Sequence, residues 1–225
     1  MLRAFDYIQD DYHQLRHPEI IGDPDLFQAW AFYAWGKYIN PTSPKNVLEI
    51  GGAFGWNLAY AIEVGLECEM IEPSTTGRKS AESLGIKSYD DAKNVPTKDY
   101  DLVLMRHVLE HVQDPAFMLE HIQRFLHSKA RLTIVLPIEK STLMPDPTDM
   151  NHHLYCWNPQ TIQNLLHSTG YSVLHISFNY MTGRKLLLPV WRSGRKDLYV
   201  RLLGLVGRIF NARELIIVAT PSRDT

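Results

Sequence analysis

The residues best suited to chemistry lie in one short stretch, NVLEIGGAFGWN, at residues 46–57. An apolar run carries Glu49 and then breaks into three closely spaced glycines, Gly51, Gly52 and Gly55. Glycine permits positive φ and lets a ligand lie against bare backbone, while the first N–H groups of a helix have no partner within it. The stretch therefore predicts a strand, a tight turn and a helix N-terminus that together hold a ligand.

The spacing of these residues favours a cationic or hydroxyl-bearing ligand over a pyrophosphate. A dinucleotide fingerprint reads G-x-G-x-x-G, whereas here G-G-x-x-G follows the carboxylate of Glu49. A second acid, Glu72, closes the next apolar run, ECEMIE, at residues 67–72. An acid at the end of the second strand, about twenty residues past a glycine turn, is where nucleotide-binding βαβ units hold a ribose diol.

Two histidines follow a later apolar run and allow three interpretations. His107 and His111 are four residues apart with Glu110 between them, an H-x-x-E-H pattern. The pattern could place a metal-binding pair on one helix face. Alternatively, His107 projects into a cleft, where imidazole is suited to accept a proton near neutral pH. The third interpretation is a structural histidine bonded to backbone.

A second polar cluster, DPTDMNHHLY at residues 146–155, follows the fifth apolar run. It offers several general bases or an oxygen–nitrogen metal site, and a solvated loop is the alternative to both. The candidates are Asp149, His152, His153 and Tyr155.

These groups need a scaffold that alternates strands with helices. Apolar runs predict strands near residues 46–50, 67–72, 86–89, 100–105, 130–136, 171–178 and 214–220. The pairs Asp114-Pro115 and Asn158-Pro159 each supply a capping side chain and a proline for the first helical position, so helices should begin there. Such alternation predicts a parallel sheet, with the ligand over the carboxyl ends of the strands.

The motifs resemble those of the class I S-adenosylmethionine-dependent methyltransferases. The stretch around Glu49 is similar to the family's acidic residue followed by G-x-G-x-G, although Ala53 replaces the middle glycine. YDLVLMRHVLEHV, residues 100–112, resembles the fourth strand and following turn of a small-molecule branch whose signature reads roughly hVLEHv. HLYCWNP and LLHSTGY, residues 153–159 and 165–171, resemble the same branch between strands five and six.

The resemblance covers residues 45–180 and implies an α/β, Rossmann-like fold. Seven mostly parallel strands would carry helices on both faces, and residues 214–220 would form an antiparallel last strand. We expect one domain over residues 1–225, with a helical N-terminal cap at residues 1–40. At 225 residues and 45% hydrophobic composition, the chain suits one sizeable core rather than two domains.

The resemblance also implies a role for each candidate. S-adenosylmethionine would be held by Glu49, Gly51, Gly52, Gly55, Glu72, Asp90, Asp91 and Arg106. Asp90 and Asp91 would face the adenine amine, or else act as ordinary helix caps. The catalytic candidates are His107, Asp149, His152, His153 and Tyr155. We expect no metal, because the resemblance accounts for H-x-x-E-H without one, and metal-dependent catechol-type relatives carry an acid where this chain has Arg106 and His107.

Methyl transfer from a sulfonium asks the protein mainly for alignment and the exclusion of water, and a base only for a protonated nucleophile. The chain lacks the Asn-Pro-Pro-aromatic and Pro-Cys motifs of nucleic-acid methyltransferases, which favours a small-molecule acceptor methylated on a hydroxyl. A sugar, a lipid-linked molecule or a phosphorylated metabolite would fit. The alternative is a degenerate methyltransferase fold that acts as a binding or assembly partner, as Ala53 and a large apolar insertion suggest.

The composition of the chain limits the partners and the cellular compartment that we expect. A formal net charge of −2 argues against a nucleic-acid partner held by bulk charge. Two cysteines, Cys68 and Cys156, form no disulfide framework and suit a reducing cytoplasm. The N-terminal sequence has no long apolar core, and no stretch reaches the roughly 18 apolar residues of a membrane span. We therefore expect a cytoplasmic protein.

The insertion, residues 184–213, has eight basic residues and one acid, Asp197, a net +7 that leaves −9 for the remainder. A polar stripe, Asp197, Arg201, Gly204, Arg208 and Asn211, divides an otherwise apolar helix. A lid or an oligomer-forming helix is one interpretation. The other is a contact with an anionic acceptor or a membrane surface.

Overall fold

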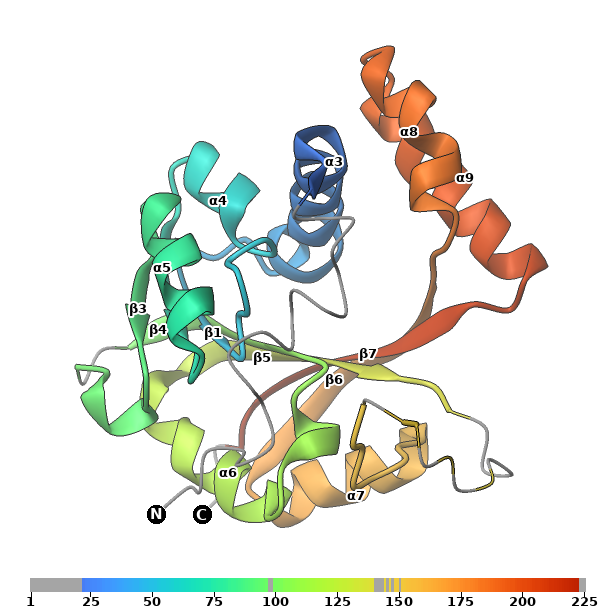
Figure 1. Cartoon of the computed structure of the whole chain (residues 1–225). Helices are drawn as coiled ribbons and strands as arrows, with labels where there is room; N and C mark the ends of the chain where they lie inside the picture. The colour runs from blue at the N-terminus through green and yellow to red at the C-terminus, as the bar shows by residue number, and fades with distance from the viewer. Residues whose placement is uncertain are drawn as a thin grey trace.

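The computed structural model describes residues 22–96, 99–139, 144, 146, 148–149 and 151–222. Within them, seven strands form one sheet in the order β3-β2-β1-β4-β5-β7-β6 (Figure 1). The strands are β1 (Asn46–Ile50), β2 (Glu67–Ile71), β3 (Lys87–Tyr89), β4 (Tyr100–Arg106), β5 (Leu126–Pro137), β6 (Tyr171–Tyr180) and β7 (Arg213–Pro221). β7 pairs antiparallel with both of its neighbours, β5 and β6, and the other four strand pairs are parallel. The predicted fold class is confirmed.

The chain order of the strands creates one switch point. From β1 the chain proceeds to β2 and β3 on one side, and then crosses to β4 and β5 on the other. Ligands of open α/β sheets bind where the order reverses, outside the carboxyl ends of the strands. The boundary between β1 and β4 is therefore the place where a site is expected.

Helices cover both faces of the sheet (Figure 1). They are α3 (Pro24–Ala34), α4 (Ala59–Glu63), α5 (Thr75–Ser83), α6 (Pro115–Ile122), α7 (Pro159–Ser168), α8 (Arg184–Arg192) and α9 (Lys196–Ile209). A π-helical turn, η1 (Trp35–Ile39), extends α3, and short 3₁₀ turns occur at η2 (Asn40–Thr42), η3 (Ala92–Asn94), η4 (Leu109–His111) and η5 (Gln123–Phe125).

Two of the helix starts follow the capping chemistry in the sequence. Asp114 accepts a hydrogen bond from the backbone N of Phe117 at 2.9 Å, and α6 begins at the proline after it. Asn158 and Thr161 form a reciprocal capping box at the start of α7. Both predicted helix starts are confirmed.

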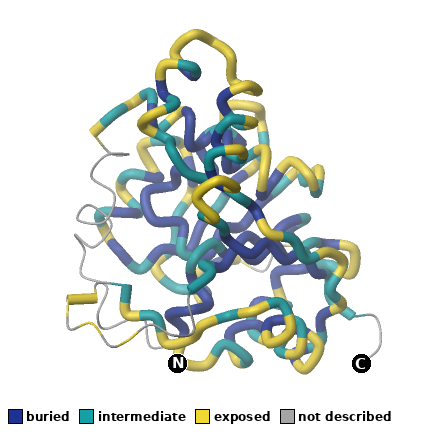
Figure 2. Tube along the Cα trace, turned by 90° about the vertical axis from the view of Figure 1, so that its right-hand side faces the viewer, coloured by how far each residue is buried: buried dark blue, intermediate teal, exposed yellow. Residues whose placement is uncertain are grey.

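Two hydrophobic clusters lie on opposite faces of the sheet, because neighbouring strand residues point to opposite sides. Val47 belongs to the cluster beneath α3, α4, α8 and α9, whereas the next residue, Leu48, belongs to the cluster beneath α6 and α7. Figure 2 shows the buried residues gathered in the middle of the molecule, with the exposed turn between α8 and α9 at the top. Sheet residues buried on both faces explain why these strands appear as nearly continuous apolar runs.

The insertion forms a pair of helices, α8 and α9, that stands beyond the β6–β7 end of the sheet (Figure 1). On α9 the buried positions are Tyr199, Leu203 and Gly207, spaced four residues apart. Gly207 is required at its position, because a Cβ there would lie 2.4 Å from the backbone N of Met181. Leu205, Ile209 and Phe210 are exposed instead. In the described part of the chain, no helix is both long and apolar enough to cross a membrane.

Candidate functional site

The glycine turn after β1 adopts the left-handed conformations that its sequence predicts. Gly51 and Gly55 have φ values of 71° and 78°, and Ala53 between them has a φ of 50°. A Cβ at Gly51 would lie 2.5 Å from Cγ2 of Val108, and one at Gly52 would lie 2.8 Å from Sδ of Met70. Ala53, at the position of the middle glycine in the G-x-G-x-G motif, thus has a left-handed backbone conformation and bears the strain of a non-glycine residue there.

Glu49 on β1 is fully buried behind this turn. Its Oε1 accepts a hydrogen bond of 2.6 Å from the amide of Asn57, and the carbonyl of that amide accepts one of 2.9 Å from the Trp30 indole. The other oxygen, Oε2, is buried and has no hydrogen-bond partner among the described residues. Burial raises the pKa of Glu49 to about 7, although Asn57 and Arg106 oppose the shift.

Glu72 follows β2, is only 2% exposed and binds the glycine turn. Its Oε2 accepts a hydrogen bond of 2.8 Å from the backbone N of Ala53, and its Oε1 accepts one of 2.9 Å from the backbone N of Ser74. The carboxylate therefore holds the glycine turn against the end of β2, in addition to any role toward a ligand.

Asp90 and Asp91 follow β3, and both make local hydrogen bonds. Asp91 accepts a hydrogen bond of 2.9 Å from the backbone N of Lys93 at the start of η3. Asp90 accepts one of 2.6 Å from the amide of Asn94, and this bond lowers its pKa. The contact of Asp91 fits the alternative interpretation as a cap, whereas that of Asp90 is with a side chain.

A pocket of about 720 Å³ opens on the other side of the switch point, at the carboxyl ends of β4 and β5. Residues from the end of β6 and the start of β7 complete its wall, because β7 runs antiparallel and so begins at this edge. The lining consists of Arg106, His107, Pro137, Ile138, Glu139, Asn179, Met181, Asn211, Ala212, Arg213 and Glu214. This volume suits a small molecule.

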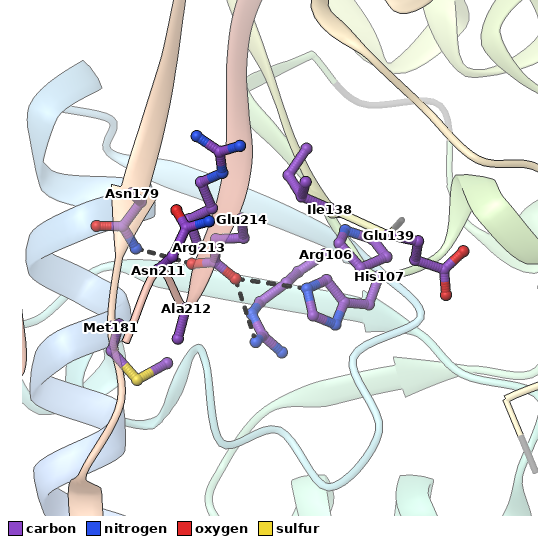
Figure 3. Close-up of a pocket in the computed structure, with 11 residues that line it drawn as sticks. Arg106, His107, Ile138, Glu139, Asn179, Met181, Asn211, Ala212, Arg213 and Glu214 are labelled. Carbon is purple, nitrogen blue, oxygen red and sulfur yellow. Dashed lines mark hydrogen bonds and ion pairs between the residues drawn. The ribbon is translucent and has the colours of Figure 1, made fainter. Parts of the chain in front are cut away.

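Glu214 is the centre of the pocket's polar network (Figure 3). It accepts hydrogen bonds from the hydroxyl of Tyr38 and, at 2.8 Å, from the amide of Asn179. Its Oε2 lies 3.5 Å from a guanidinium nitrogen of Arg106 and 3.4 Å from Nε2 of His107. Burial would raise the pKa of Glu214, but Arg106, His107 and Tyr38 outweigh it and lower the pKa to about 2. Glu214 is therefore ionised at pH 7, and its carboxylate faces these donors.

Arg106 connects this network to the glycine turn. Its guanidinium lies 4.7 Å from the ring centroid of Trp30 and 5.9 Å from that of Tyr38, and it is close enough to lower the pKa of Glu49. Stacking on aromatic faces suits the planar, weakly hydrated guanidinium. The cation thus stands between the two buried carboxylates, Glu49 and Glu214.

His107 has a φ of 53°, an uncommon backbone conformation for a residue with a side chain. Its side chain is 36% exposed, although Nε2 itself is buried against Glu214. Burial and the neighbouring Arg106 lower the pKa of His107 to about 4, so the imidazole is neutral at pH 7. A neutral imidazole beside a carboxylate is able to accept a proton and to be stabilised once it has done so.

The polar cluster predicted at residues 146–155 divides into two parts. His153 is brought inward, with its Nδ1 2.6 Å from Oε1 of Glu139 and its ring 4.7 Å from that of His111. Asp149 stays in its own turn, where it accepts hydrogen bonds from the backbone N of Asn151 and His152. The side chain of His152 is exposed.

Tyr155 lies on the surface, where its hydroxyl donates to the carbonyl of Gln113 at 3.0 Å. Of the five catalytic candidates, His107 alone lines the pocket, and His153 reaches it through Glu139.

Four residues of the polar network were not among the site residues predicted from the sequence: Tyr38, Glu139, Asn179 and Glu214. One signal was available for Glu214, which is an acid at the start of an apolar run expected to be an antiparallel last strand. The reversed direction places the first residues of that strand opposite Pro137, at the carboxyl end of β5. No feature of the sequence indicated a role for Tyr38, which donates a hydrogen bond to Glu214 from η1.

Comparisons with known proteins agree with the fold. Residues 27–176 match the model of a family described as a methyltransferase domain. No curated protein matches the chain. A Haloferax volcanii complex between the Trm112 methyltransferase activator and a putative methyltransferase matches at a TM-score of 0.63 and 14% identity, covering 96% of this chain and 98% of that chain.

Two other solved structures are similar. Haemonchus contortus phosphoethanolamine N-methyltransferase 2 matches at a TM-score of 0.60 and 16% identity, over 95% of this chain and 60% of its own. Burkholderia thailandensis 1,6-didemethyltoxoflavin-N1-methyltransferase matches at a TM-score of 0.59 and 16% identity, over 94% and 84%. These identities establish the shared fold alone. Because the family model spans two thirds of the sequence, this chain belongs to the methyltransferase domain family.

Proposed function

We propose that this protein transfers a methyl group from S-adenosylmethionine to a small-molecule acceptor bound in the pocket beside His107 and Glu214. The observation that carries the proposal is the meeting of two features at one switch point. The glycine turn with Glu49 follows β1, and the pocket follows the adjacent strand, β4. Solved structures with the same fold, including a plantazolicin methyltransferase, contain S-adenosylhomocysteine.

The residues around the turn fit the cofactor. The buried oxygen Oε2 of Glu49, which lacks a hydrogen-bond partner in the described chain, suits an ammonium donor. Glu72 offers a carboxylate at the strand end where a ribose diol is expected. The amino-acid part of the cofactor also carries a carboxylate. The guanidinium cation of Arg106 suits this group. Residues 52–59 are buried, so we expect the side chains that cover the turn to move when the cofactor binds.

The bound cofactor supplies an electrophilic methyl group on a sulfonium, and the protein's residues prepare the acceptor. We propose that Nδ1 of His107, the ring nitrogen that does not face Glu214, accepts the proton of an acceptor hydroxyl as the hydroxyl oxygen takes the methyl group. Glu214, already ionised, then stabilises the imidazolium. The apolar lining, including Ile138 and Met181, excludes water from the reacting atoms.

An acceptor hydroxyl is the finer part of this proposal. A hydroxyl keeps its proton at neutral pH and so benefits from a base, and a neutral His107 beside Glu214 provides one. The pocket volume suits a metabolite or a sugar unit better than a polymer.

A second function, a binding protein without transferase activity, is favoured by the strained alanine of the turn. Ala53 stands at a φ of 50° where the family carries glycine. A fold of this kind also serves other chemistry, since the [4+2]-cyclase SpnF matches at a TM-score of 0.59 and 15% identity. Glu49 and Glu72 are both present, which favours the transferase.

Cofactor binding is tested first, and turnover of an identified acceptor then separates the two functions. Thermal unfolding is measured with S-adenosylmethionine or S-adenosylhomocysteine at millimolar concentration, and small molecules retained by the purified protein are identified by mass spectrometry. A ligand that binds the native state alone raises the melting temperature by mass action. The proposal predicts a shift with both compounds. No shift with either would reject it, and a retained acceptor would supply the substrate for turnover assays.

A further inference from the structure

A cluster of nitrogen and oxygen ligands lies beside the pocket and has no part in the proposed transfer. Glu110 and His111 come from η4, directly after β4, and His153 comes from the segment before α7. One ligand atom from each of the three residues lies within 4.8 Å of the other two. Glu110 and His111 were adjacent in the H-x-x-E-H pattern, whereas His153 joins them only through the fold.

Glu110 is the most unusual member of the cluster. It is 0% exposed, and neither carboxylate oxygen accepts a hydrogen bond from another described residue. An ionised carboxylate is costly to bury without a partner. Such a group is expected to be neutral or to have a cation as its partner.

The two histidines are already oriented as metal-ligating histidines usually are. His153 contacts Glu139 through Nδ1 at 2.6 Å, which leaves Nε2 as the ligand atom when Nδ1 carries the proton. The ring of His111 is held by a hydrogen bond to the backbone of His152. A histidine that binds a metal commonly donates its other ring N–H to a carboxylate or a backbone carbonyl, which fixes the tautomer.

Backbone hydrogen bonds fasten the two halves of the cluster together. The carbonyl of Glu110 accepts from the backbone N of Leu154 at 2.8 Å and of Tyr155 at 3.3 Å. The Tyr155 hydroxyl adds its bond to the carbonyl of Gln113. The segment that carries His153 is therefore attached to the turn that carries the other two ligands, and the cluster is a built part of the fold.

We propose that Glu110, His111 and His153 bind a divalent transition-metal ion of the Zn²⁺ class, with Glu139 as the carboxylate that orients His153. Two imidazoles and one carboxylate are an established ligand set for zinc, and three protein ligands leave one coordination position open. Ligand atoms of a tetrahedral zinc ion at about 2.0–2.1 Å lie roughly 3.4 Å apart. Since the present separations are at most 4.8 Å, the side chains need to close by no more than about 1.4 Å. This site was not expected from the sequence, because the two halves of its ligand set are far apart in the chain.

The inference does not depend on methyl transfer, and its test uses metal binding itself. Purified protein is stripped with a chelator, loaded with Zn²⁺ alone and assayed by competition with a zinc-responsive dye and by elemental analysis. Co²⁺ is used in parallel, because its visible absorption spectrum reports tetrahedral nitrogen–oxygen coordination. We expect about one Zn²⁺ per chain.

Two variants test ligands, a third tests the carboxylate that orients His153, and one matched control tests specificity. Glu110→Gln keeps the shape of the side chain, and His153→Gln changes a residue in the irregular segment before α7, so each variant should fold. Each should lower Zn²⁺ affinity at least tenfold. Glu139→Gln should lower affinity about 10–100-fold through the orientation of His153. His175→Ala removes an exposed histidine on β6 and should leave affinity unchanged.

Circular dichroism and thermal unfolding establish that each variant is folded before its affinity is interpreted. Folded wild-type protein that fails to bind Zn²⁺ or Co²⁺ at micromolar concentration overturns the proposal. Binding that survives in both Glu110→Gln and His153→Gln overturns it as well, because the metal would then lie elsewhere.

Discussion

At the scale of single residues, Glu49 connects the pH of the solution to the stability of the fold. Its pKa rises from an ordinary 4.5 to about 7 on burial. The Glu49 carboxyl therefore holds its proton more tightly in the folded state than in the unfolded state. Its contribution to the free energy of unfolding is greatest below about pH 4.5. It falls as pH rises toward 7, by up to about 3 kcal/mol. Glu49→Gln should remove this part of the pH dependence.

The measurement is urea unfolding at pH 5 and pH 8, for the wild type and for Glu49→Gln. The wild type should lose more stability between the two pH values than the variant does. Equal losses in the two proteins would show that Glu49 is ionised throughout, and that its surroundings stabilise the charge.

His107 and Glu214 are expected to act on turnover and to leave cofactor binding nearly intact. His107→Ala should lower turnover about 10²–10⁴-fold, the usual contribution of a general base. Glu214→Gln should lower turnover as well, because the imidazolium loses its carboxylate partner. Turnover is measured with the acceptor identified by mass spectrometry, and cofactor affinity by calorimetry. Turnover of His107→Ala within a few-fold of wild type would mean that the acceptor needs no base from this residue.

Glu72 combines a ligand role with a structural one. From the sequence, Glu72→Ala should weaken cofactor binding by about 1–3 kcal/mol and leave folding intact. The structure alters the second half of that expectation, because the backbone N–H groups of Ala53 and Ser74 would lose their acceptor. We therefore expect a loss of about 1–3 kcal/mol in the free energy of unfolding as well. A variant with unchanged stability and affinity would contradict both roles.

At the scale of elements, basic residues of the insertion attach the α8–α9 pair to α3 and its neighbours. Nζ of Lys196 lies 5.4 Å from the ring centroid of Phe32, 5.7 Å from that of Tyr60 and 5.1 Å from that of Trp191. Nε of Arg192 lies 2.6 Å from the carboxylate of Asp25. Part of the +7 charge of the insertion therefore attaches the helix pair to the core.

Replacing Lys196 should consequently loosen this attachment. Lys196→Gln loses the cation–π contacts and should lower the melting temperature by about 1–4 °C. Arg195→Gln is the matched control, since Arg195 is an exposed cation on the same turn. Differential scanning calorimetry decides between them, and an equal decrease for the two variants would mean that general charge, and not the aromatic rings, holds the helices.

At the scale of the whole molecule, the separation of charge between the insertion and the remainder favours contact with an anionic surface. Arg201 is exposed on α9 near the exposed side chains of Leu205 and Ile209. A basic residue near an anionic membrane contributes about 1 kcal/mol. Arg195→Gln combined with Arg201→Gln should therefore lower binding to phosphatidylserine-containing vesicles about 30-fold at low salt.

Vesicle sedimentation measures this effect, and raising the salt concentration should reduce the difference because it shortens the Debye length. Zwitterionic vesicles serve as the control. Wild-type protein that ignores anionic vesicles, or a double variant that changes only the oligomeric state in analytical ultracentrifugation, would contradict the surface contact and favour a subunit interface.

The sequence predicted the scaffold better than it predicted the site. Strands such as β1 and β4 are nearly continuous apolar runs buried on both faces, and Asp114 and Asn158 mark helix starts by local capping chemistry, so neighbouring residues were sufficient to find them. Glu214 was not predicted as a site residue, because its partners come from separate elements. A single sequence does not show that Asn179 and Tyr38 will meet it.

The network around Glu214 also limits when the pocket forms during synthesis. Tyr38 and Glu214 are 176 residues apart, and Tyr33 and Asn179 are 146 apart. A ribosome adding about 5–20 residues per second needs roughly 9–35 s to pass from Tyr38 to Glu214. During that interval the aromatic residues of α3 and η1 are available to chaperones or to incorrect partners. Contacts of such long sequence range also form late in folding, so the polar pocket is among the last parts of the molecule to become native.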